Sequence, residues 1–180
     1  MPRLETPRLV LRPPEYSDAP AFARHLCDYE VAKNLASVPH PYGLADAQDF
    51  VSRVSAGRAR GESFAFTILF KEDGAVLGCC GLDLRKGIFD LGYWIGRPYW
   101  GMGIATEAAR RLISFAFNGL KADRLSAGWF TDNPVSGRVL SKLGFAPAGV
   151  MPYSCRARGA EVACNRMALS RAGFGRKQAA

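Results

Sequence analysis

Residue types suited to binding phosphate gather in one stretch of the chain, residues 91–112, which reads LGYWIGRPYWGMGIATEAARRL. Its apolar pattern predicts a strand, then a glycine-rich turn, then the start of a helix. The first turn of a helix leaves backbone N–H groups without intrahelical partners, and aligned peptide dipoles add positive charge there. Gly101 and Gly103 remove side chains that would hold a phosphate away from those groups, and Thr106 adds a hydroxyl donor. The stretch therefore predicts a pyrophosphate site.

Two other kinds of phosphate site fit the residues less well. A P-loop requires a lysine directly after its last glycine, and the glycine-rich turn contains no lysine. A dinucleotide-binding turn follows the first strand of a parallel unit, whereas three strands of antiparallel type are expected before these glycines. A tight turn whose glycines serve packing alone remains the alternative at this point.

Hydrophobic periodicity predicts the elements that position the turn. Period-two runs joined by short turns predict antiparallel strands, and apolar residues at helical spacing predict helices. Asn133 and Pro134 have the residue types of a helix cap and a first helical position. We expect strands at 8–12, 64–70, 76–84, 89–95, 125–130, 145–151 and 161–169, helices at 17–25, 47–61, 104–116 and 134–143, and a helical segment at 28–36.

This order of elements predicts a single α/β (α+β) domain over residues 1–170. Its mixed, mostly antiparallel central sheet should have about six to seven strands, flanked by about four helices. Residues 171–180 are basic and predict a flexible, solvated tail. The five cysteines show no CxxC spacing and pair with neither histidine, so buried thiols are expected and no metal site.

The net charge of +8 attracts phosphate, whether on nucleic acid or on a nucleotide cofactor. The charges are scattered along the chain, so direct nucleic-acid binding is not expected. No apolar run approaches the roughly 18–20 residues of a membrane span. The opening MPRLETPRLVLR lacks the long apolar stretch of a secretory signal. We therefore expect a cytoplasmic protein without a membrane association.

Two motifs resemble those of one enzyme family. Leu91–Trp94 followed by Trp100–Ala108 resembles motif A of the GCN5-related N-acetyltransferases (GNAT), particularly the RimJ/RimL-type branch with its WGxGxATEA pattern. Trp100 stands where the general motif has Arg or Gln, as in many members of that branch. The branch's NxxSxxxLxKxGF pattern is matched by Asn133, Ser136, Leu140, Lys142, Gly144 and Phe145. The opening LETPRLVLRP also resembles the branch's first strand, so the resemblance spans about residues 4–170.

The resemblance implies acetyl-CoA as cosubstrate, held where the strand before the turn splays from its neighbour. The backbone of Trp94 and Ile95 would then pair with the pantetheine arm, and the Ile95 N–H would polarise the thioester carbonyl. Asn133 would contact the pantetheine end, in addition to or instead of capping its helix. The pyrophosphate would lie on Trp100, Gly101, Met102, Gly103, Ile104, Ala105 and Thr106.

For catalysis, the resemblance implies direct attack of a neutral amine on the thioester, with a proton donor for the leaving thiolate. Many relatives place a tyrosine for this purpose where this chain has Leu140. Members of the RimJ/RimL-type branch use a serine instead, and Ser136 occupies the matching position. The alternative is that Ser136 is only a hydroxyl on the helix surface. The base is open: Glu161 is one candidate, and Glu30, His40, Asp90, Tyr153 or a water chain are others.

The resemblance leaves the acceptor open between a basic or ribosomal protein N-terminus and a small-molecule amine. Acceptor pockets in this family are formed by segments corresponding to residues 20–42 and 150–160. Arg156 and Arg158 in the second segment would suit a carboxylate-bearing acceptor, or they are solvated loop charges. A non-catalytic acyl-CoA-binding module with the same fold is the alternative function. The chain is expected to be a monomer or a homodimer.

Overall fold

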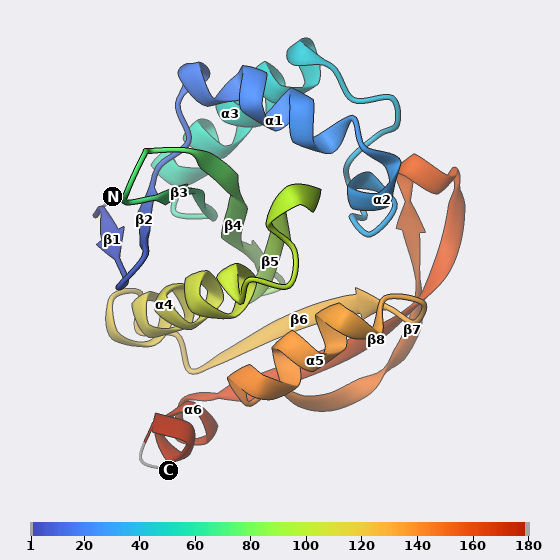
Figure 1. Ribbon diagram of the computed structural model, residues 1–180. Coiled ribbons are helices and arrows are strands. Elements are labelled where there is room, and N and C mark those ends of the chain that lie inside the picture. The colour runs from blue at the N-terminus through green and yellow to red at the C-terminus, as the bar shows by residue number, and fades with distance from the viewer. Residues whose placement is uncertain (1, 179–180) are drawn as a thin grey trace.

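The computed structural model describes residues 2–178, with side chains to residue 175, and shows one sheet between two groups of helices (Figure 1). The strand order is β1-β2-β3-β4-β5-β6-β8-β7. Neighbours are antiparallel except β5 and β6, which are parallel. The strands are β1 (Leu4–Glu5), β2 (Leu9–Arg12), β3 (Ser63–Phe70), β4 (Val76–Arg85), β5 (Ile88–Ile95), β6 (Arg124–Phe130), β7 (Ala146–Cys155) and β8 (Ala160–Ser170).

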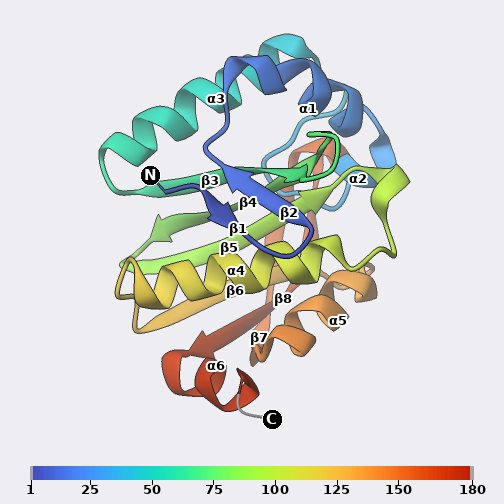
Figure 2. The same cartoon turned by 60° about the vertical axis from the view of Figure 1, so that its left-hand side comes forward.

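Helices cover both faces of the sheet, as Figures 1 and 2 show from two directions. On one face lie α1 (Ala19–Leu26) and α3 (Leu44–Ala59), with the short α2 (Tyr29–Ala32) beyond them. On the other lie α4 (Ile104–Asn118) and α5 (Pro134–Leu143). The apolar stripe of α4 packs into the main core with Leu112 and Ile113 fully buried, while Arg110 on its opposite side is exposed. The predicted fold class is confirmed.

The element count is slightly higher than expected. Residues 2–178 contain eight strands, because Leu4–Glu5 adds a short edge strand to β2, and six α-helices, three of them of eight residues or fewer. The helical segment expected at 28–36 ends at Ala32, because the following backbone carbonyls bond to the β7–β8 turn: the Arg156 N–H donates to the Ala36 carbonyl at 3.0 Å. No helix in this described range is long and apolar enough to cross a bilayer.

The C-terminal segment differs from the solvated tail that the sequence predicted. Arg171–Gln178 form helix α6, and the Phe174 side chain is buried against Phe117 of α4, with ring centroids 5.5 Å apart. A single aromatic residue in a short basic segment gave no periodic signal, so the helix depends on this tertiary contact. The end of the predicted tail, residues 179 and 180, lies outside the described residues.

Gly78 of β4 lets β4 and β5 approach closely. A Cβ at this position would lie 2.1 Å from the carbonyl oxygen of Trp94, which is backbone and cannot swing aside. Gly78→Ala is therefore expected to lower the free energy of unfolding by roughly 3 kcal/mol, measured by urea denaturation. Gly92→Ala in β5 is the matched control, because no heavy atom lies within 4 Å of its added Cβ. Equal stability of the two variants would contradict this role of Gly78.

Candidate functional site

The parallel pair β5 and β6 separates part of the way along its length. Residues Phe89–Leu91 of β5 pair with residues Leu125–Ala127 of β6, and beyond these pairs the two strands diverge. The opening belongs to a cleft of about 1180 Å³ that crosses the sheet. Splayed parallel strands leave unpaired backbone groups facing the gap, so an extended ligand can complete the ladder there. We call this opening the slot.

Backbone alternation decides which residues of β5 face the slot. The Gly96 N–H donates to the Leu77 carbonyl of β4 at 2.8 Å, and in an antiparallel pair such bonds fall on every second residue. The backbone of Trp94 therefore also faces β4, and that of Ile95 faces the slot. This differs from the expectation that both backbones reach the slot. Trp94 instead contributes its side chain to the cleft wall, packed edge-on against Phe22 with ring centroids 5.4 Å apart.

The glycine-rich turn follows the slot directly. Gly101 and Gly103 both have φ +77°, a conformation that residues with a side chain rarely adopt, and Gly103 is the N-cap of α4. The Trp100 indole N–H donates to the Ile95 carbonyl at 2.7 Å, so Trp100 ties the turn to β5. Of the seven predicted turn residues, only Met102 is not among those that line the cleft, which are Trp100, Gly101, Gly103, Ile104, Ala105 and Thr106.

Arg8 holds the start of α4 in place, which the sequence did not reveal. Its guanidinium donates from Nη2 to the Met102 carbonyl at 3.1 Å and from Nε to Glu107 at 2.7 Å. Thr6 donates its hydroxyl to the same Glu107 carboxylate at 2.6 Å. Burial raises the pKa of Glu107, but these hydrogen bonds outweigh it and keep the pKa below the usual value. The resemblance of residues 4–13 to the family's first strand was the only sequence signal for this contact.

The start of α5 brings three polar groups to the slot. Asn133 accepts the Ser136 N–H on Oδ1 at 3.3 Å, which caps the helix. The Ser136 hydroxyl lies 2.9 Å from the hydroxyl of Tyr93, which comes from β5. Burial raises the pKa of Tyr93 to about 12, although the Ser136 hydrogen bond lowers it, so the phenol stays protonated at neutral pH. All three residues line the cleft.

The sequence does not single out Tyr93, because the run LGYW indicates only a strand. Strand alternation places Tyr93 on the same face of β5 as Leu91 and Ile95, whose side chains belong to the main core under α4. That alternation was the available signal. Its partner on α5 lies 43 residues away in the sequence, so only the tertiary structure reveals the pair.

The rest of the cleft contains three of the five candidate bases. Glu30 lies 2.7 Å from the Lys33 ammonium group, and Asp90 accepts the Ser126 hydroxyl at 2.7 Å and pairs with Arg166. Tyr153 accepts a hydrogen bond from Arg85 at 2.9 Å. Each of these three side chains therefore already has a hydrogen-bonding or ionic partner within the protein.

The other two candidate bases are not brought to the cleft. His40 is exposed and packs edge-on against Tyr29, with ring centroids 5.1 Å apart. Glu161 is exposed beside the β7–β8 turn, in register with Ser154. Neither residue lines the cleft. Glu161 therefore lies outside the cleft that Ser136 and Ile95 line. The structure does not identify any single side chain as the base.

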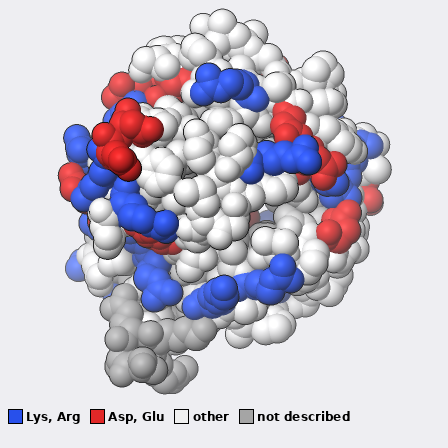
Figure 3. Space-filling model, in the orientation of Figure 1, with Lys and Arg blue, Asp and Glu red and all other residues white. Residues whose placement is uncertain are grey.

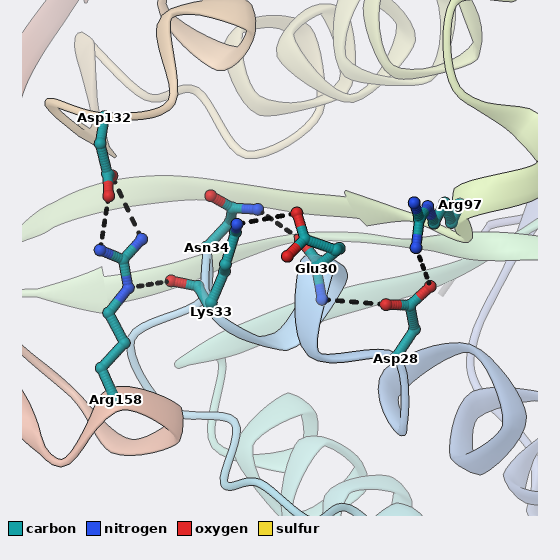
Figure 4. A network of polar contacts seen from close by, with 7 residues as sticks. All are labelled: Asp28, Glu30, Lys33, Asn34, Arg97, Asp132 and Arg158. Carbon is teal, nitrogen blue, oxygen red and sulfur yellow. Dashed lines mark hydrogen bonds and ion pairs between the residues drawn. The ribbon is translucent and has the colours of Figure 1, made fainter.

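Arg158 is neither a free ligand for a carboxylate-bearing acceptor nor a solvated loop charge, because it is bonded to other segments of the protein. It donates to both carboxylate oxygens of Asp132, at 2.6 and 3.1 Å, and to the Lys33 carbonyl at 2.8 Å (Figure 4). The hydrogen bonds from Arg158 lower the pKa of Asp132. One side chain thus joins the β7–β8 turn, the segment after α2 and the turn before Asn133. Arg156 remains exposed at the cleft.

Basic side chains border the cleft on the α5 side. Figure 3 shows Lys and Arg side chains along α5, which carries the exposed residues Arg138 and Lys142, and both line the cleft. Positive charge beside a glycine-rich helix start attracts a phosphate-bearing ligand. Within residues 2–178, no group of three or more His, Cys, Asp or Glu side chains is placed to hold a metal ion.

His25 of α1 packs against the end of β5 and is expected to make the stability depend on pH. Its Nε2–H donates to the Val76 carbonyl at 2.9 Å, and a Cβ on Gly96 would lie 2.5 Å from Nδ1. Burial lowers the pKa of His25, and Arg24 lowers it further. Because the folded pKa lies below the unfolded value of about 6.5, the unfolded chain gains the proton first as the pH falls. The free energy of unfolding should therefore fall as the pH drops below about 6.5.

The variant His25→Gln tests this dependence because it keeps a donor for Val76 but does not titrate. Urea denaturation at pH 7.5 and pH 5.5 should show a smaller loss of stability for the variant than for the wild type. His40 is exposed and present in both proteins, so it serves as an internal control. Identical losses in the two proteins would show that His25 is not the group responsible.

Comparisons with known proteins point to one family. The family model described as Acetyltransferase (GNAT) domain matches residues 8–146. The N-acetyltransferase p20 of Bacillus licheniformis is 32% identical over 162 residues, covering 88% of this chain and 90% of p20. The L-amino acid N-acetyltransferase AaaT of Escherichia coli is 27% identical over 146 residues, covering 78% and 85%. The fold matches Mycobacterium smegmatis RimJ in complex with CoA-disulfide with a TM-score of 0.82 at 22% identity, covering 95% of this chain and 88% of RimJ.

Proposed function

Because this chain belongs to the GNAT family of acetyl-CoA-dependent N-acetyltransferases, we propose that it acetylates a primary amine by direct attack on the thioester. The acceptor is the N-terminal amine of a protein or a small-molecule amine. One observation carries the proposal: the slot between β5 and β6 continues into the glycine-rich turn, with Ile95 and Ser136 where the two meet. The extended pantetheine arm of acetyl-CoA fits the slot, and its pyrophosphate fits the glycine-rich turn.

The cofactor's groups have counterparts along the cleft. The pantetheine arm lies in the slot beside the Ile95 backbone, with Asn133 near its thiol end. The pyrophosphate lies on the N–H groups between Trp100 and Thr106 at the start of α4. Two features support this placement: no heavy atom lies within 4 Å of a Cβ added at Gly101, and Arg8 fixes the turn by donating to the Met102 carbonyl.

In the chemical step, the amine nitrogen attacks the thioester carbonyl carbon, and the C–N bond forms as the C–S bond breaks. The Ile95 N–H donates to the carbonyl oxygen as negative charge develops on it. Ser136 gives its hydroxyl proton to the leaving thiolate and regains one from solvent. The amine's own proton leaves to water in the acceptor half of the cleft, and Glu30 and Asp90 are among the carboxylates that line its walls.

The acceptor half is bounded by residues 33–39 on one side and the β7–β8 turn on the other. Its charged residues are of both signs, and most are paired with each other. The names of relatives indicate two acceptor classes: an L-amino acid for AaaT, and a ribosomal protein for RimJ/RimL-type enzymes. We therefore include both classes in the test.

The test is release of free CoA thiol from acetyl-CoA by the purified chain, with peptides of varied N-terminal residue and free amino acids as acceptors. Turnover with a peptide, an amino acid or both supports the proposal and selects the acceptor class. Thermal stabilisation by acetyl-CoA without thiol release on any acceptor would contradict it and would indicate a binding module. Absence of stabilisation by either acetyl-CoA or CoA would contradict the cofactor site itself.

A further inference from the structure

The hydroxyl of Tyr93 contacts the residue that we propose as proton donor. Tyr93 Oη lies 2.9 Å from Ser136 Oγ and 3.3 Å from the Ser136 carbonyl oxygen. The two residues come from β5 and from the start of α5, and both line the cleft. Ser136 is the third residue of α5, where the helix dipole favours negative charge. A tyrosine therefore reaches the reaction centre from β5, although Leu140 occupies the position where many relatives have one.

Two hydrogen-bond arrangements fit these distances, because each hydroxyl carries one proton. If Tyr93 donates to Ser136 Oγ, the serine proton is directed into the slot. If Ser136 donates to Tyr93, the tyrosine proton goes to the more distant Ser136 carbonyl and the serine has no proton for the thiolate. The 2.9 Å contact between the two hydroxyls fits donation in either direction. A phenol is more acidic than an aliphatic alcohol and is therefore the stronger donor, which favours donation from Tyr93.

We propose that Tyr93 is the positioning residue of the proton donor: it donates to Ser136 Oγ and thereby aims the single serine proton at the departing thiolate. As that proton moves to sulfur, negative charge grows on Oγ and the bond from Tyr93 becomes charge-assisted and stronger. An interaction that is stronger in the transition state than in the ground state raises kcat and leaves substrate binding unchanged. This inference rests on the proposed function, because Ser136 must be the donor.

The experiment is a double-mutant cycle with Tyr93→Phe, Ser136→Ala and the combined variant, measured by thiol release. Tyr93→Phe should lower kcat by roughly 10- to 100-fold, as expected for a hydrogen bond to a charged group. The KM for acetyl-CoA and the Kd for CoA should change less than about threefold. In the Ser136→Ala background, the same substitution should cost less than about twofold, because its target is absent. An equal cost in both backgrounds would overturn the proposal.

A second measurement needs no turnover. With tyrosines labelled with ¹³C at Cζ, Ser136→Ala should shift the Tyr93 resonance of the CoA complex and leave the other tyrosines in place. An unmoved Tyr93 resonance would overturn the proposal even if no acceptor is found. Tyr42→Phe removes another buried tyrosine hydroxyl on the opposite face of the sheet, and its denaturation curve gives the stability cost of such a loss. Inactivity of the wild type on every acceptor would instead count against the proposed function.

Discussion

Gly101→Glu is expected to lower the affinity for CoA by roughly 100-fold or more. The added carboxylate would occupy the open space above the turn, close to the expected pyrophosphate. Two like charges about 4 Å apart repel by about 4 kcal/mol at an effective dielectric constant of 20, and about 1.4 kcal/mol corresponds to tenfold in affinity. The side chain also blocks the approach of phosphate to the N–H groups at the start of α4. Isothermal titration calorimetry with CoA measures the loss.

The matched control for this variant is Gly61→Glu. Gly61 has φ +74°, close to the +77° of Gly101, and neither position has a heavy atom within 4 Å of an added Cβ. The two substitutions therefore carry the same left-handed backbone strain, of roughly 1–2 kcal/mol. Gly61 follows α3, and it is not among the residues that line the cleft. CoA affinity should be unchanged in Gly61→Glu, and equal affinities in the two variants would contradict the pyrophosphate site.

Ser136→Ala is expected to lower kcat by roughly 100- to 1000-fold, within the range for loss of general acid–base catalysis. Without the hydroxyl, the leaving thiolate must take its proton from water. The Kd for CoA should change less than about threefold, because the cap of α5 uses the Ser136 N–H and not its side chain. Steady-state thiol release gives kcat, and calorimetry gives the Kd separately.

Ser141→Ala serves as the control on the same helix. Its hydroxyl donates to the Gly137 carbonyl at 2.9 Å, and the residue is not among those that line the cleft. Loss of this hydroxyl should leave kcat within about twofold of the wild type. If Ser136→Ala also stays within that range, the thiolate's proton comes from another source and the serine is only a helix-surface hydroxyl.

Local patterns determined much of the fold. The period-two runs of residues 64–95 became β3, β4 and β5, because short turns force sequence neighbours to pair in space. The strand, glycine turn and helix at 91–112 formed as expected, because glycine permits the positive φ values that Gly101 and Gly103 adopt. The cap by Asn133 is likewise a contact between residues three apart.

Other features depended on residues far apart in the sequence. The helix α6 rests on Phe174 packing against Phe117, and α2 ends early because the β7–β8 turn bonds to the backbone after it. The sequence predicts an acceptor ligand or a solvated charge for Arg158, since nothing near it in the sequence indicates Asp132 as its partner. A pattern within one segment carries no information about such partners.

In the candidate site, too, some features follow from local sequence and others depend on residues far apart in the chain. The sequence by itself determined the glycine-rich turn at Trp100–Thr106, where we propose that the pyrophosphate binds, and through resemblance it pointed to Asn133 and Ser136. Only the tertiary structure decided that Ile95, and not Trp94, turns its backbone to the slot, that Glu161 lies away from the cleft, and that Tyr93 meets Ser136. The physical reason is that a helix start needs only neighbouring residues, whereas a reaction centre between two strands and a helix exists only where they converge.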